Sequence, residues 1–175
     1  MSDAFRHRPA AGEFNDFYAG YISHVPDGSV LETLKEQHVV FARVFNSITA
    51  DRVDHAYAEG KWTVRQVLAH INDTERIFAY RALCFARGDA GPLPGMDQDA
   101  YVSGAHVETR TFAGLVDEFV NIRASTISLV KGMTANDLMR QGVASGFGFS
   151  VRALCWIMAG HAQHHVSILQ ERYLQ

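Results

Sequence analysis

The sequence is poor in cysteine: its 175 residues contain only two, Cys84 and Cys155. Both lie in apolar stretches that are far apart, which argues against a disulfide framework and favours buried free thiols in a reducing compartment. The sequence also lacks a run of about 18 apolar residues, the length that a membrane-spanning helix needs. Residues 1–13 contain no apolar stretch of the kind found in secretory signals. We therefore expect a soluble cytoplasmic protein with no membrane partner.

The sequence has no excess of charge of one sign. Its 16 Lys and Arg residues are interspersed with 19 Asp and Glu residues, for a net charge of −3. No segment is basic enough to indicate nucleic acid as the main partner. The alternation of polar and apolar residues that is typical of half-buried strands is absent as well. The length and a hydrophobic content of 47 % suit one domain with one sizeable core.

Apolar residues recur at spacings of three and four, which predicts long amphipathic helices. A shorter helix rich in aromatic residues is expected to lead in from Phe14, and its side chains could supply a homodimer contact. Residues 1–13 are expected to form a flexible arm and residues 14–175 a single domain. The glycine-rich residues 142–149 are expected to be a plain loop. The four long helices are predicted at residues 29–47, 63–87, 112–131 and 150–173.

The connection at residues 89–110 is long for a compact domain. Such a segment can act as a crossover, which lets the second and third long helices run parallel. At the start of the second long helix, Thr63 and Gln66 have the spacing of a capping box. The predicted fold is therefore all-α, a four-helix bundle with a crossover connection.

The last predicted helix carries three histidines within residues 160–165 (Gly-His-Ala-Gln-His-His). His161 and His165 are four residues apart and share one face, with β-carbons about 5–6 Å apart, so two imidazoles can bind one metal ion. His164 also shares a face with His161, but His165 better continues the apolar inner side of the helix. Because histidines at this spacing also occur without a metal, the hypothesis needs a third ligand.

His70, at the inner edge of the second long helix, can supply that third ligand. If the two helices are neighbours, three imidazole nitrogens can lie about 2.0–2.1 Å from one ion. Imidazole suits Zn, Ni, Cu or Fe(II), and three protein ligands leave a position open, as in catalytic sites. The His-Glu-x-x-His pattern of zinc peptidases is absent, because Ala162 follows His161.

Three segments together resemble the DinB/YfiT-like superfamily: KWTVRQVLAHINDTER at residues 61–76, YRAL at residues 80–83 and GHAQHH at residues 160–165. The resemblance extends over about residues 14–174. It implies a four-helix bundle that holds a divalent metal, commonly zinc or nickel, through three histidines. The matching residues in this sequence are His70, His161 and His165.

The resemblance implies more than one activity. Characterised relatives are S-transferases or isomerases that use low-molecular-weight thiols such as bacillithiol, mycothiol or glutathione, and many members are described as metal-dependent hydrolases. A metal ion with an open position fits both reactions, since it can lower the pKa of a thiol or activate water. We favour a thiol S-transferase acting on a small-molecule substrate. The alternatives are a hydrolase and a non-catalytic metal-binding stress-response module.

The second long helix contains three further polar residues of interest, Asp73, Arg81 and Glu75. Asp73, three residues after His70, is a candidate catalytic residue that would orient His70 or act as a base; the alternative is a solvated carboxylate. Arg81 is a candidate cofactor-binding residue for an anionic thiol, and an interhelical ion pair is its alternative role. Glu75 is expected on the solvated face of the helix.

Overall fold

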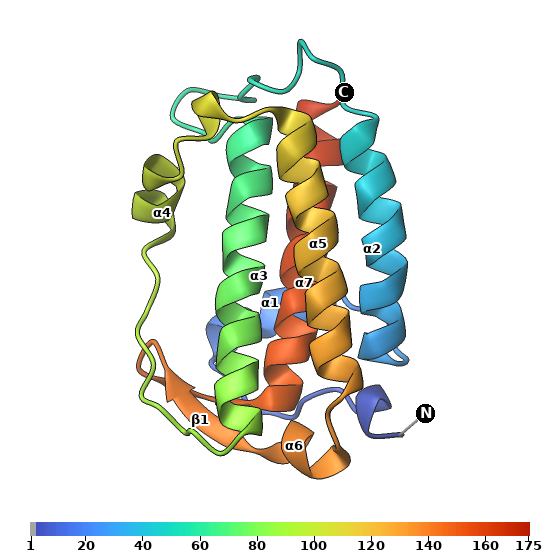
Figure 1. Ribbon diagram of the computed structural model, residues 1–175, viewed down its shortest axis with the longest axis vertical. Coiled ribbons are helices and arrows are strands. Elements are labelled where there is room, and N and C mark those ends of the chain that lie inside the picture. The colour runs from blue at the N-terminus through green and yellow to red at the C-terminus, as the bar shows by residue number, and fades with distance from the viewer. Residues whose placement is uncertain (1–2) are drawn as a thin grey trace.

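The computed structural model describes residues 3–175, and its centre is a bundle of four long helices (Figure 1). In this view α3 and α5 run downwards, whereas α2 and α7 run upwards. The predicted four-helix bundle with a crossover connection is therefore confirmed. The four helices are α2 (Val30–Asn46), α3 (Val64–Ala86), α5 (Phe112–Lys131) and α7 (Val151–Ile168).

Side-chain caps fix where the long helices begin. The Thr63 hydroxyl accepts a hydrogen bond from the backbone N–H of Gln66, and the Gln66 side chain accepts one from the backbone N–H of Thr63. This is the predicted capping box, and it starts α3. The Ser150 hydroxyl caps α7 by accepting from the backbone N–H of Ala153. Beyond Ile168 the last helix continues into a π-helical turn, Leu169–Tyr173.

The crossover between α3 and α5 lies along one side of the bundle, at the left of Figure 1. It contains the short helix α4 (Gln98–Gly104) and a 3₁₀ turn at Val107–Thr109. Asp97 caps α4 by accepting from the backbone N–H groups of Asp99 and Ala100. The crossover thus covers α3 and brings α4 against it.

Residues 141–150 form a β-hairpin, so the expectation of a plain loop there was wrong. Strand β1 (Gln141–Ala144) pairs antiparallel with β2 (Phe147–Ser150). Ser145 and Gly146 connect them with φ values of 53° and 80°, as a two-residue hairpin turn requires. Backbone hydrogen bonds from Leu93 to Val143 and from Ser145 to Leu93 attach the hairpin to the crossover. The strands are too short and too rich in glycine to show a period of two.

The segment before the bundle is packed rather than loose. Phe5 is buried in the core, and Arg8 donates hydrogen bonds to the carbonyl oxygens of Ile22 and Val25. The carboxylate of Glu13 pairs with the guanidinium of Arg152 on α7. The expectation of a flexible arm at residues 1–13 was therefore wrong for residues 3–13, while residues 1–2 lie outside the described part.

The predicted lead-in helix is present as the 3₁₀ turn Asp16–Tyr18 followed by α1 (Ala19–Ser23). Its backbone crosses α7 at Gly160, where a β-carbon would lie 1.9 Å from the carbonyl oxygen of Tyr21. Only a glycine permits this approach. The glycine just before the histidines therefore lets α1 pack directly on the helix that carries them.

A buried polar network joins all four long helices. Arg123 on α5 is fully buried and donates to both carboxylate oxygens of Glu75 on α3, at 2.7 and 2.6 Å. It also donates to the side-chain oxygen of Gln37 on α2 at 2.7 Å, and the Gln37 amide donates to the carbonyl oxygen of Ala159 on α7 at 3.0 Å. The expectation that Glu75 lies on a solvated face was therefore wrong.

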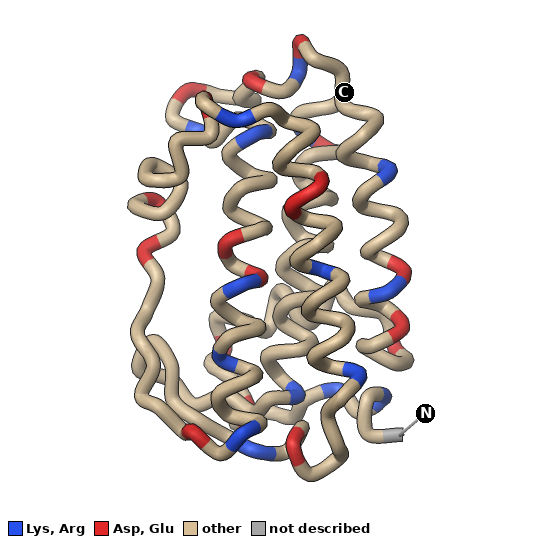
Figure 2. Tube along the Cα trace, viewed as in Figure 1, with Lys and Arg blue, Asp and Glu red and all other residues tan. Residues whose placement is uncertain are grey.

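The remaining charges are distributed as the sequence indicates. Acidic and basic residues are interspersed along the chain in Figure 2. No helix within residues 3–175 combines the length and the apolar character that crossing a membrane requires.

Candidate metal centre

Three histidines from two helices meet inside the bundle. His70 comes from the second turn of α3, and His161 and His165 come from successive turns of α7. One nitrogen of each ring can be chosen so that all three lie within 4.8 Å of one another, and the Nε2 atoms of His70 and His161 are 3.0 Å apart. The structure thus brings together the three residues that the sequence indicated as metal ligands.

The dimensions of this cluster suit one ion. Ligand nitrogens at 2.0–2.1 Å from a tetrahedral centre are separated by about 3.3 Å, so the observed spacing needs only small side-chain adjustments. Burial lowers the pKa of His70 to about 4 and that of His165 to about 3. Burial, with the neighbouring imidazoles, also places the pKa of His161 well below its ordinary value. All three rings are therefore neutral near neutral pH, and the neutral ring is the form that binds metal.

Thr74, one turn after His70 on the same face of α3, orients the His70 ring. Its hydroxyl oxygen lies 3.4 Å from His70 Nδ1. When Nδ1–H donates to this oxygen, the lone pair of Nε2 faces the other two histidines, which is the usual way that a protein directs a ligating imidazole. From the sequence, Asp73 was expected to orient His70. The spacing of four residues between His70 and Thr74 could have indicated Thr74 instead, because residues four apart share a helix face.

Asp73 instead lies beside Arg76, with 3.5 Å between carboxylate and guanidinium. Burial raises its pKa, while the charge of Arg76 opposes the rise. Among the hydrogen bonds and ion pairs of residues 3–175, none joins Asp73 to the three histidines. Its predicted role in catalysis therefore gains no support from the structure.

His164 points away from the cluster. Its Nδ1 lies 3.4 Å from Nε2 of His24, and its ring packs on the edge of Tyr21. The structure therefore places His165, and not His164, beside His70 and His161. Aromatic rings enclose the centre on two sides: Trp62 is 4.8 Å from the His70 ring and Tyr21 is 5.3 Å from the His161 ring, measured between centroids.

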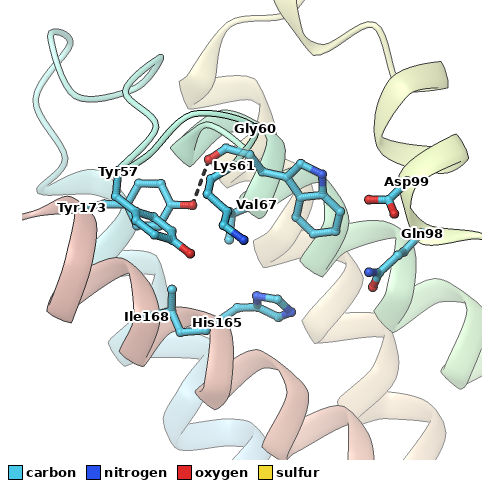
Figure 3. Close-up of a pocket in the computed structure, with 10 residues that line it drawn as sticks. Tyr57, Gly60, Lys61, Val67, Gln98, Asp99, His165, Ile168 and Tyr173 are labelled. Atoms are coloured by element: carbon cyan, nitrogen blue, oxygen red, sulfur yellow. Dashed lines mark hydrogen bonds between the residues drawn. The ribbon is translucent and has the colours of Figure 1, made fainter.

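Two cavities border the centre from different directions. The first, about 270 Å³, is named the Tyr57 cavity (Figure 3). His165 extends into it from α7, with Tyr57 and Tyr173 on one side and Gln98 and Asp99 of α4 on the other. The Tyr173 hydroxyl donates to the carbonyl oxygen of Trp62 across one edge of this cavity.

The second cavity, about 260 Å³, is named the Arg81 cavity. His70 and His161 lie in its wall, and Gln98 of α4 lines both cavities. The rest of the wall is mostly apolar and aromatic, and is formed mainly by Phe17, Tyr18, Tyr21, Ile77, Phe78 and Met96.

Arg81 is almost completely buried at this second cavity. One of its guanidinium nitrogens donates to the carbonyl oxygen of Pro94 at 2.8 Å and to the hydroxyl of Ser145 at 2.9 Å. Burial lowers the pKa of Arg81, although the Tyr18 hydroxyl opposes the shift. The interhelical ion pair considered for Arg81 is absent among the described residues. Its observed partners, Ser145 of the hairpin and Pro94 of the crossover, were not predictable from helical spacing.

Comparison with known proteins agrees with this architecture. The sequence model of the DinB superfamily matches residues 33–169. Among solved structures, the chain is similar to YfiT from Bacillus subtilis, with a TM-score of 0.72 and 16 % sequence identity over 97 % of this chain and 95 % of that chain. YfiT is described as a "probable metal-dependent hydrolase with an unusual four-helix bundle topology". No curated protein matches the sequence.

Proposed function

Because the chain belongs to the DinB superfamily, we propose that its three-histidine cluster binds a divalent metal ion and that the protein is a metal-dependent enzyme. The observation that carries the proposal is the convergence of His70, His161 and His165, with all three rings neutral and buried or nearly so. Buried imidazoles without acidic partners suit zinc or nickel. When bound, the ion supplies a positive charge that lowers the pKa of a thiol or a water molecule.

For the reaction, we favour the transfer of a low-molecular-weight thiol to an electrophile. The supporting feature is the pair of cavities, since each contains at least one of the three histidines and together they provide room for two reactants. In this reaction the thiol gives up its proton, and its sulfur forms a bond to the electrophilic carbon. The leaving group departs with the electrons of the broken bond and takes up a proton.

The chain's own residues would position the reactants. In the Tyr57 cavity, the hydroxyl of Tyr57, the ammonium of Lys61 and the carboxylate of Asp99 offer polar contacts to a thiol that carries amide and carboxylate groups. In the Arg81 cavity, Phe78 and Met96 offer an apolar surface that excludes water from the electrophile. Gln98 borders both cavities and is the side chain best placed to contact both reactants.

Hydrolysis is the second candidate, and the similarity to YfiT favours it. In that case the oxygen of a water molecule forms a bond to the electrophilic centre, the leaving group departs with the electrons of the broken bond, and one proton of the water goes to the leaving group. A hydrolase needs one organic substrate, so only one of the two cavities would be used.

The metal hypothesis is tested first, by elemental analysis of the full-length protein after incubation with zinc or nickel. We expect about one ion per chain. The variant His161→Ala should lose the ion and keep its helical circular dichroism, whereas His164→Ala, a matched control on the same helix, should keep the ion. If the wild type holds no stoichiometric metal, the proposal fails.

The reaction is tested with a panel of electrophiles and with glutathione, bacillithiol and mycothiol in turn. Thiol consumption by the metal-loaded protein, and none by the metal-free protein, supports transfer. Product release that needs metal but no thiol supports hydrolysis. If chelation lowers the melting temperature and no substrate of either class reacts, the protein is a non-catalytic metal-binding module and the proposed enzyme function is wrong.

A further inference from the structure

Residues 3–175 contain two buried arginines, Arg81 and Arg123, and of these two only Arg123 has a carboxylate partner. Arg123 is fully buried and forms a two-bond pair with Glu75. Arg81 is 3 % exposed, but the groups that accept its hydrogen bonds are the carbonyl of Pro94 and the hydroxyls of Ser145 and Tyr18, and it forms no ion pair within residues 3–175. Its charge interacts with the phenols of Tyr18 and Tyr101, not with an acidic side chain.

A buried guanidinium without an anion is costly, because neutral oxygens replace only part of its lost hydration. At Arg123 that cost is offset inside the protein. At Arg81 the side chain borders a cavity of about 260 Å³, so an anion can approach from solvent. Arginine also binds carboxylates through directed N–H donors, which makes it a suitable anchor for an acid.

The other residues of the cavity indicate what accompanies the negative charge. Among the described residues that line the wall, Arg81 is the only lysine or arginine, so the site suits one negative charge better than a doubly charged phosphate. Phe78 lies under the guanidinium at 5.5 Å from its ring centroid, and Met96 and Ile77 continue the apolar surface. A peptide-like thiol with several polar groups fits such a wall poorly.

The position of Arg81 also separates the acid from the metal centre. Arg81 and His70 are three helical turns apart on the same face of α3, about 16 Å along the helix axis. A carboxylate held at Arg81 is thereby kept away from the three histidines, and the other end of the molecule is directed towards them.

We propose that the Arg81 cavity binds a small monocarboxylic acid with an aromatic or apolar body, its carboxylate on Arg81 and its remaining part facing His70 and His161. This deepens the proposed function, since it names the substrate class of that site. From the sequence, an anionic thiol was considered as the ligand of Arg81, whereas we assign the thiol to the Tyr57 cavity and the acid to the Arg81 cavity.

The test compares benzoate with its neutral analogue benzamide by isothermal titration calorimetry. Chelator-treated protein is used, so that a carboxylate cannot bind through a metal ion. We expect benzoate to bind at least tenfold more tightly than benzamide to the wild type. Arg81→Met, which keeps most of the side-chain volume, should abolish this preference, and Arg81→Lys should retain part of it.

Three results would overturn the proposal. Equal affinity of the wild type for the two compounds is one, and absence of benzoate binding at millimolar concentration is another; neither depends on a variant that folds. Arg81-dependent binding of glutathione in place of benzoate would show that Arg81 binds the thiol and not a monocarboxylic acid. Because these measurements use metal-free protein, they are independent of the elemental analysis, and either proposal can fail while the other stands.

Discussion

Removal of the Arg123 guanidinium is expected to destabilise the fold strongly. In Arg123→Met the carboxyl group of Glu75, itself 2 % exposed, loses both of its short hydrogen bonds and remains buried without a partner. Breaking a buried pair in this way costs about 3–5 kcal/mol. For a domain of this size, that corresponds to a fall in melting temperature of about 6–20 °C.

The free energy of unfolding of a set of variants is measured by urea denaturation, with circular dichroism as the signal. The double variant Arg123→Met/Glu75→Leu removes both charges and should recover at least half of the lost stability, because no uncompensated ion remains. Arg110→Met is the matched control, since Arg110 pairs with Glu118 at 2.7 Å in a more exposed place, and it should cost about 1 kcal/mol or less. If Arg123→Met costs no more than Arg110→Met, or the double variant is no better than the single one, the argument is refuted.

Three more predictions use the same measurements. Gly160→Ala should displace α1 and lower the melting temperature, because its β-carbon would lie 1.9 Å from the Tyr21 carbonyl oxygen; unchanged stability would contradict the close packing. Glu13→Gln should be less stable than the wild type at neutral pH, and the difference should shrink below pH 4.5. Burial raises the pKa of Glu13, but hydrogen bonds, foremost from Arg152, bring it below its ordinary value. The ionised carboxylate therefore stabilises the fold above the ordinary pKa, and this stabilisation is lost when the carboxylate is protonated. A constant difference across pH would disprove this. Thr63→Ala should cost about 1 kcal/mol through loss of the cap, and no change would show that the start of α3 is held by packing alone.

The fold and the shared face of His161 and His165 were predictable because they depend on local periodicity, whereas His70 was added on the condition that its helix neighbours the last one, and through the resemblance to the DinB/YfiT-like superfamily. Apolar spacing gave the four helices, the Thr63 capping box gave the start of α3, and the spacing of four residues placed His161 and His165 on one face. Glu75 was misplaced because its partner, Arg123, comes 48 residues later, and no local pattern reveals such a pair.

The features that the sequence did not reveal depend on contacts between distant segments. The hairpin packs so closely that a β-carbon on Gly142 would lie 2.3 Å from the Phe85 ring, a fit that periodicity cannot show. The cavities combine residues from the crossover, the lead-in and the long helices. Gln98 was not predicted at all, because its place beside both cavities depends on how α4 returns along α3.

The crossover has an evolutionary consequence. The imidazoles are anchored in helices whose spacing the whole core determines, whereas Gln98 and Asp99 belong to α4, a short helix in the connection between α3 and α5. Mutations in that connection can alter the walls of the two cavities while the three histidines keep their places on α3 and α7. The bundle itself tolerates wide variation, since this chain and YfiT share the fold with only 16 % of their residues identical.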